Sequence, residues 1–141
     1  MSMLARPDGA RQALARGRLQ ATSFVVVCMV RLALCFFPYR ILRRFVPRAA
    51  GRTDSRFYAR RVAASVRTAA SWVPGASCLT QTLAAQYLLA RSGHQSAMRI
   101  GVRKEANGSL TAHAWLLCEG AVVLGGSEEE LASYAPLTDL D

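Results

Sequence analysis

Residues 97–126, AMRIGVRKEANGSLTAHAWLLCEGAVVLGG, decide the fold of this chain. Apolar and polar residues alternate over 98–103, which is the pattern of a half-buried strand. Asn107-Gly108 supplies a turn after that strand. A hairpin around Glu119-Gly120 is expected next, with strands at residues 110–118 and 121–124. The stretch therefore predicts consecutive antiparallel strands, with His113 inside an otherwise apolar one.

Helical patterns precede these strands. Residues 54–72 and 78–91 carry apolar residues at helical spacing. Ser77 is a suitable N-cap for the second helix, and Ser92-Gly93 closes it. The tail at 127–141 is acidic, and its YAPL segment is expected to pack back onto the body. Helices followed by an antiparallel sheet predict the α+β class.

The most hydrophobic stretch covers residues 19–38. About 20 apolar residues are needed to span a bilayer. Arg31 interrupts this stretch, at a cost of about 2.5–3.5 kcal/mol in a membrane, and Pro38 ends it. A buried or interfacial helix is therefore favoured over a span. Residues 39–48, YRILRRFVPR, suit a surface helix on the same core, with a helix lying on a membrane or a partner as the alternative.

Charge divides the chain unevenly. Residues 1–72 hold fourteen arginines against two aspartates, a net charge of +12, whereas the remainder carries −3. Such a basic part favours anionic partners. Nucleic acid is disfavoured among them, because no groove-reading helix or aromatic RNA-binding pattern accompanies the arginines. A length of 141 residues predicts one compact fold, with a basic helical region at 1–53 packing on or flanking a core at 54–141.

The four cysteines indicate the compartment. They are widely spaced without a CxxC pair, and residues 1–18 lack the apolar segment of a signal peptide. A reducing, cytoplasmic location with free thiols is therefore expected. The histidines and cysteines match no zinc-ligand spacing. No cofactor motif is evident, so no cofactor or metal is expected.

Cys78 is the cysteine with catalytic potential. It follows a Pro-Gly turn and opens a predicted helix. The free N–H groups and partial positive charge at a helix start favour a thiolate, which is the nucleophilic form of cysteine. Cys28 and Cys35 lie in the apolar stretch and are interpreted as packing residues. Cys118, near the hairpin tip, is interpreted as structural.

A thiolate nucleophile needs an acid/base partner, and the chain offers two histidines. His94 follows Ser-Gly in a loop. His113 lies on a strand and shares its face with Trp115, two residues further on. A cysteine at a helix start facing a strand histidine is one way to build a cysteine hydrolase. The alternative is an inert cysteine and a core histidine, and spacing by itself leaves both open.

Residues 77–93, SCLTQTLAAQYLLARSG, and 99–115, RIGVRKEANGSLTAHAW, followed by a hairpin strand, resemble a known family. It comprises the transglutaminase-like cysteine peptidases of lasso-peptide biosynthesis, stand-alone leader peptidases of the type found as the C-terminal domain of the microcin J25-processing protein. The resemblance covers about residues 54–138 and implies a transglutaminase- or papain-like core. It implies that Cys78 is the nucleophile, that His113 is the general base, and that the substrate is a lasso precursor peptide.

The resemblance also implies partners. A separate leader-recognition protein and a macrolactam-forming cyclase are expected, and the basic helices offer a docking surface for them or for peripheral contact with a membrane. Two alternatives stay open. A non-enzymatic membrane-associated adaptor would use residues 19–46 as its anchor. An acyltransferase would use the same Cys–His chemistry and differ only in the nucleophile that resolves the thioester.

The third catalytic position departs from the family. Its members commonly carry an aspartate about twelve residues after the histidine, where this chain has Gly125. Counting back from the Glu119-Gly120 turn places His113 opposite Gly126. Glu119 would then lie at the hairpin tip, about 20 Å from His113 and too far to orient it. Three candidates for the orienting group remain, namely Ser127, Glu128 and a backbone carbonyl.

Overall fold

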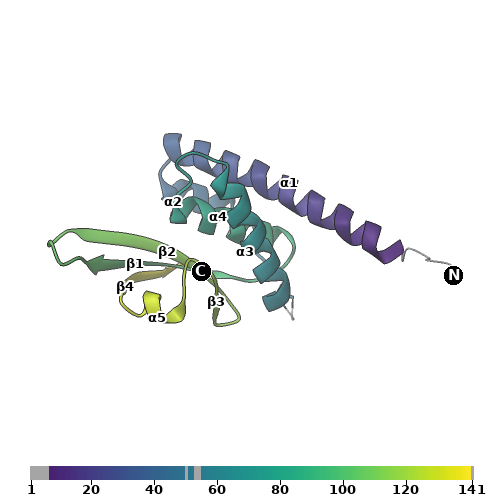
Figure 1. Cartoon of the computed structure of the whole chain (residues 1–141). Helices are drawn as coiled ribbons and strands as arrows, with labels where there is room; N and C mark the ends of the chain where they lie inside the picture. Colours follow the sequence, from purple (N-terminus) through teal and green to yellow (C-terminus); the bar gives the residue numbers. More distant parts are fainter. Residues whose placement is uncertain (1–6, 50, 53–54, 141) are drawn as a thin grey trace.

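The computed structural model describes residues 7–49, 51–52 and 55–140. The helical half comprises α1 (Pro7–Phe36), α2 (Tyr39–Leu42), the 3-10 turn η1 (Arg43–Phe45), α3 (Ser55–Ser71) and α4 (Cys78–Arg91). The second half comprises β1 (Ala97–Lys104), β2 (Leu110–Cys118), β3 (Ala121–Leu124), the one-turn helix α5 (Glu128–Leu131) and β4 (Ala135–Leu140). The α+β class expected from the sequence is confirmed. Helices α3 and α4 lie between the sheet and α1 (Figure 1).

Helix α1 is longer than the apolar stretch from which it was predicted. The sequence pattern placed the helix within 19–38, whereas the structure begins it at Pro7 and ends it at Phe36. The added turns are rich in alanine, arginine, leucine and glutamine, which are strong helix formers. Pro7 suits the first position of a helix, and Asp8 lies in the positively polarised first turn.

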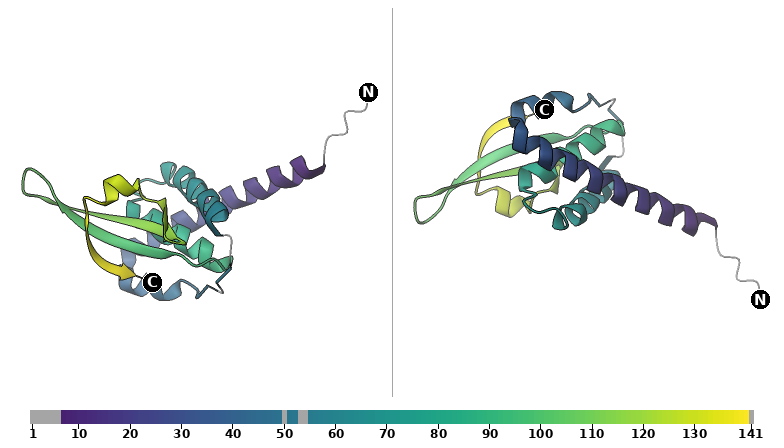
Figure 2. Two further views of the ribbon diagram at one scale, coloured as in Figure 1. Left: turned by 90° about the horizontal axis from the view of Figure 1, so that it is seen from below. Right: turned by 90° about the horizontal axis from the view of Figure 1, so that it is seen from above.

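One side of α1 belongs to the core. Ser23 and Val27 are fully buried and Val26 is nearly so. The Ser65 hydroxyl of α3 lies 2.9 Å from the Ser23 hydroxyl and 3.0 Å from the Gln20 side-chain oxygen, so polar contacts fix the crossing of the two helices. The N-terminal half of α1 projects beyond the rest of the molecule (Figure 2).

Small residues let α3 approach its neighbours closely. Its buried side is mostly alanine, with Val62 and Val66 as the larger members. In α4, Leu83 and Leu89 are buried, and the predicted N-cap is confirmed because the Ser77 hydroxyl accepts a hydrogen bond from the Thr80 N–H. Helix α4 therefore has a fixed start, directly before Cys78.

The sheet is antiparallel, with strand order β3-β2-β1-β4. Strands β2 and β3 have the bounds expected from the sequence, and Glu119 and Gly120 both adopt positive φ, as a two-residue hairpin turn requires. The Glu119 carboxylate accepts a hydrogen bond from the Ser55 N–H and lies 3.5 Å from Arg56. The hairpin turn thereby anchors the sheet to the start of α3.

Two features of the sheet differ from the sequence expectation. The count from the turn was wrong, because a bulge shifts the register between Leu116 and Leu117: Leu117 pairs with Val122, but Leu116 pairs with Leu124. His113 is thus not opposite Gly126. In addition, the tail expected only to pack back onto the body forms α5 and then β4, which pairs with β1 as an edge strand.

Candidate active site

Cys78 is the first residue of α4 and is half-buried. The turn before it is supported from α1. The Arg31 guanidinium donates to the Pro74 carbonyl at 3.4 Å and covers Gly75, where a Cβ would lie 2.7 Å from Arg31 Nη2. Gly75 has φ +75°, a backbone conformation that favours glycine, and its missing side chain leaves room for the guanidinium. Arg31, which interrupts the apolar stretch, therefore stabilises the turn that precedes Cys78.

The start of α4 keeps hydrogen-bond donors available. The Ser77 hydroxyl occupies the Thr80 N–H, and the Gln81 N–H donates to the Ser77 carbonyl. Across the described residues, no acceptor is found for the backbone N–H groups of Cys78 and Leu79. Two N–H groups beside the thiol are therefore free to bind an oxyanion.

His113 lies in the middle of β2, opposite Gly101 of β1. Its Nε2 is hydrogen-bonded to the Gly125 carbonyl. A carbonyl oxygen can only accept, so Nε2 carries the hydrogen and Nδ1 is the nitrogen that can take up a proton. An imidazole held through one nitrogen with the other free is the arrangement a general base requires.

An aromatic cluster surrounds His113. The Tyr134 ring centroid is 5.5 Å from that of His113, and the Trp115 centroid is 6.4 Å away. The cluster sits on Gly101, where a Cβ would lie 2.8 Å from the Trp115 ring and 2.9 Å from Tyr134. Only glycine allows the rings to lie this close to β1, and the cluster limits how far the imidazole can turn.

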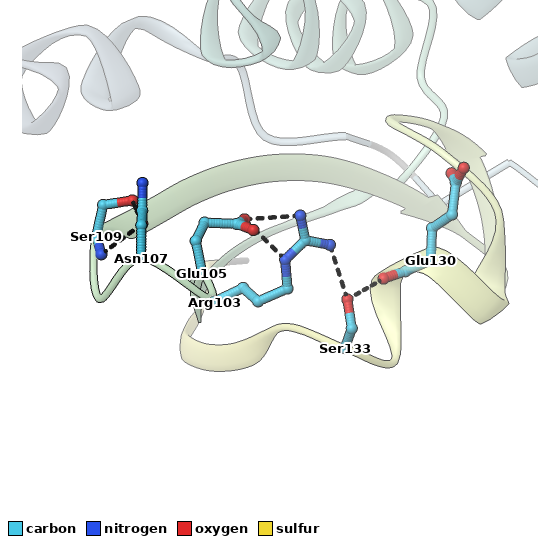
Figure 3. A network of polar contacts seen from close by, with 6 residues as sticks. All are labelled: Arg103, Glu105, Asn107, Ser109, Glu130 and Ser133. Carbon is cyan, nitrogen blue, oxygen red and sulfur yellow. Dashed lines mark hydrogen bonds and ion pairs between the residues drawn. The ribbon is translucent and has the colours of Figure 1, made fainter.

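A polar network around Arg103, which also packs on Tyr134, supports this cluster; Figure 3 shows Arg103 with Glu105 and Ser133. Arg103 lies 4.8 Å above the Tyr134 ring centroid and donates to the Glu105 carboxylate at 2.8 Å and to the Ser133 hydroxyl at 3.2 Å. The Ser133 hydroxyl in turn donates to the Glu130 carbonyl. Hydrogen bonding to Arg103 lowers the pKa of Glu105, which favours the charged pair. The segment after α5 is thereby tied to β1.

Thr82 connects the two halves of the candidate site. Its buried hydroxyl lies 2.7 Å from the Cys78 carbonyl oxygen and 3.4 Å from the Ala114 carbonyl oxygen. The backbones of the first turn of α4 and of β2 beside His113 therefore meet at one side chain.

The reactive atoms themselves are not joined. Among the described residues no hydrogen bond links the Cys78 thiol to a histidine. Along β2, Leu116 and Cys118 face the core shared with α3 and α4, whereas His113 alternates with them and lies among Trp115 and Tyr134. The structure thus brings together the backbones that carry the two groups, and not the thiol and the imidazole.

The group that contacts His113 is a backbone carbonyl, one of the three candidates from the sequence. Gly125 has φ +110°, and a Cβ there would lie 2.8 Å from the Trp115 Cα and 2.9 Å from the Ala114 carbonyl oxygen. An aspartate does not fit this backbone. Ser127 is occupied in the capping box of α5 with Glu130. Gly125 follows Leu124, the partner of Leu116, and lies against Trp115, from where its carbonyl reaches His113.

His94 is a core histidine at the other end of α4. It is 8% exposed and stacks on Tyr58 with ring centroids 4.6 Å apart. The Ser55 hydroxyl donates to the Arg52 carbonyl, so the His94 Nδ1–H donates to that hydroxyl at 2.7 Å. A helix of 14 residues is about 21 Å long, which separates His94 from Cys78. His94 is therefore not positioned to assist the thiol.

Stability should depend on the charge of His94. Burial, and then the nearby Arg52, lower its pKa below the ordinary value. As the pH falls below about 6.5, the unfolded chain binds the proton first, so the folded state loses stability down to the lowered pKa. Urea unfolding from about pH 7.5 to about pH 5 should show this loss, and His94→Gln should reduce it. An equal pH dependence in both proteins would contradict this assignment.

A cleft of about 1010 Å³ is lined by His94, by η1 and the loop after it, by the start of β1, and by the end of β2 with its hairpin turn. Arg43, Arg44, Arg48 and Arg99 give it a basic lining. Neither Cys78 nor His113 contributes to it. Within the described ranges, no cluster of three or more histidine, cysteine or acidic side chains is arranged to hold a metal ion.

Helices packed on a four-stranded antiparallel sheet, with a cysteine opening the helix that contacts β2, are consistent with a transglutaminase-like α+β domain. Residues 23–139 match the transglutaminase-like superfamily, and the chain belongs to this superfamily. Its members are often cysteine peptidases. Comparison with curated proteins and with solved structures gives no match.

Proposed function

We propose that this protein is a cysteine peptidase that removes the leader from a ribosomally made lasso-peptide precursor. The observation that carries the proposal is Cys78 at a helix start with free N–H groups, in a superfamily rich in cysteine peptidases. The second support is His113, held through Nε2 with Nδ1 available. The restriction to lasso precursors rests on the sequence resemblance around residues 77–93 and 99–115.

In the first half of the reaction the Cys78 thiolate attacks the carbonyl at the leader–core junction. The backbone N–H groups of Cys78 and Leu79 stabilise the oxyanion that forms. His113 takes the thiol proton at Nδ1 and delivers it to the departing amine. The leader is left as a thioester on Cys78, and the core peptide leaves with a free amino group.

In the second half water hydrolyses the thioester. Neutral His113 accepts a proton from the water through Nδ1, and the Gly125 carbonyl stabilises the imidazolium through Nε2–H. A cysteine nucleophile tolerates a carbonyl in place of a carboxylate, because a thiol ionises far more readily than a hydroxyl. In the structure the imidazole lies on the face of the sheet that points away from α4, so this chemistry requires a rearrangement of β2 that carries His113 to the Cys78 thiol.

Partners provide the specificity in this proposal. A leader-recognition protein presents the precursor, and a cyclase closes the ring on the amino group that cleavage releases. The closure of the Cys78–His113 pair then occurs in the complex with precursor and recognition protein. A reducing cytoplasm keeps the four cysteines, which are all free in the structure, as thiols.

Mass spectrometry of a cognate precursor tests the proposal. The precursor is incubated with the protein, with and without the recognition protein. We expect release of the intact leader, and a higher rate when the recognition protein is present. Intact precursor with both proteins folded and the precursor bound would overturn the peptidase and favour the adaptor. Transfer of the leader to an added amine in preference to water would favour an acyltransferase.

A further inference from the structure

Helix α1 carries a line of exposed apolar side chains along its outer side. Val25, Met29, Leu32 and Phe36 are spaced by four, three and four residues, which places them on one line along the helix. Their exposed fractions are 54%, 64%, 62% and 78%. Large apolar residues gathered in this way on a surface mark an interaction site.

The opposite side of the same helix is buried in the core. Ser23, Val26 and Val27 are buried against α3 and α4. The helix from Asp8 to Phe36 is long and apolar enough to cross a membrane, and only 17% of its most apolar window is buried. Crossing would nevertheless remove Val26 and Val27 from the core. The outer line can instead meet an apolar medium while α1 stays in place.

Arginines bracket the apolar line at both ends. Arg11 and Arg18 fall on the same line of α1 and are exposed. Beyond its C-terminal end, exposed Phe37, Ile41 and Phe45 alternate with arginines, and these segments lie beside α1 (Figure 2). Those arginines are Arg40, Arg43 and Arg44. Residues 9–53 contain no aspartate or glutamate, but Arg43 and Arg44 line the same cleft as Glu119, so Arg11 and Arg18 on α1 are the arginines that the outer face itself offers.

We propose that the outer face of α1, from Arg11 to Phe36, docks flat on a membrane surface that contains anionic phospholipids. The apolar side chains enter the boundary between headgroups and acyl chains, and the arginines bind lipid phosphates while their stems pack on the apolar surface. A protein partner needs a matching shape, whereas an apolar line that continues into exposed arginines on the same side of the helix matches the layered chemistry of a lipid surface.

Docking in this way leaves the sheet accessible. The sheet lies on the other side of α3 and α4 from α1 (Figure 1). His113 and the aromatic cluster therefore face away from the lipid, and soluble partners can reach them. The inference rests on the exposed side chains of α1 and does not depend on peptidase activity.

Co-sedimentation of the full chain with preformed vesicles tests the proposal. Vesicles of phosphatidylcholine are compared with vesicles that also contain phosphatidylglycerol. We expect sedimentation with the anionic vesicles that weakens as salt is raised. The double variant Met29→Glu/Leu32→Glu should lower partitioning about tenfold or more, because both side chains would enter the apolar layer. Arg11→Gln/Arg18→Gln should lower it severalfold on the anionic vesicles only.

Matched controls separate docking from general effects. Leu110→Glu/Leu137→Glu places the same two charges at similarly exposed apolar positions on β2 and β4, and Arg91→Gln/Lys104→Gln removes two charges elsewhere. Both should sediment like the wild type. Circular dichroism checks folding, and the arginine pair gives an independent test if the glutamate pair unfolds.

Four outcomes would overturn the proposal. One is a wild type that stays in the supernatant with anionic vesicles, and another is unchanged binding of both α1 variants. The third is a dimer in solution that Met29→Glu/Leu32→Glu dissociates without any lipid affinity in the wild type, which would assign the face to a second copy. The fourth is protein that resists extraction by salt and carbonate, which would show a span.

Discussion

Cys78→Ala is expected to abolish leader release, with a fall in the cleavage rate of about four orders of magnitude or more. The thiolate forms the bond that converts one difficult step into two easier ones, and alanine has no group that can replace it. The structure gives a reason to expect a folded variant. Cys78 is half-buried, its side chain makes no hydrogen bond among the described residues, and the Ser77 cap of α4 is unaffected.

The measurement compares single-turnover cleavage by the wild type, Cys78→Ala and Cys35→Ala. Cys35 is an exposed cysteine of α1, so its replacement controls for loss of a reactive thiol elsewhere. Alkylation with iodoacetamide should inactivate the wild type and Cys35→Ala at equal rates. Cleavage by Cys78→Ala at the wild-type rate would exclude Cys78 as the nucleophile. Loss of activity in Cys35→Ala alone would instead identify Cys35 of α1 as the nucleophile.

The parts of the fold that the sequence predicted are those specified by local chemistry. The bounds of β2 and β3 follow from alternating side chains around Glu119-Gly120, which adopt the positive φ angles of a tight turn. The start of α4 follows from the Ser77 cap. Each depends on residues adjacent in sequence, so the signal does not need tertiary structure.

The parts that escaped prediction depend on contacts between distant residues. The bulge between Leu116 and Leu117 has no signal in the turn from which the register was counted. Strand β4 is specified by its pairing with β1 across the sheet. The role of Arg31 beside Gly75 also needed the structure, because 44 residues of sequence separate them. A backbone carbonyl was one candidate among three, and only the folded position of Gly125 beside Trp115 and His113 selects it.

A backbone carbonyl, and not a carboxylate, contacts His113 because the backbone at position 125 accommodates only glycine. Gly125→Asp, which introduces the residue common in the family, is expected to destabilise the fold by about 3 kcal/mol or more. The backbone there has φ +110°, a region that side chains disfavour, and the new Cβ would lie within 3 Å of Trp115 and the Ala114 carbonyl. The added carboxylate would therefore displace the strand end that orients His113, and cleavage should fall.

Urea unfolding and cleavage assays measure both consequences, with Gly108→Asp as the matched control. Gly108 also has positive φ, at +84°, but a Cβ there meets no atom within 4 Å. Its substitution should cost about 1 kcal/mol and leave cleavage unchanged. The difference between the variants isolates the contact with β2 from backbone strain. A Gly125→Asp protein as stable as the wild type and faster in cleavage would show instead that a carboxylate fits beside His113 and completes a triad.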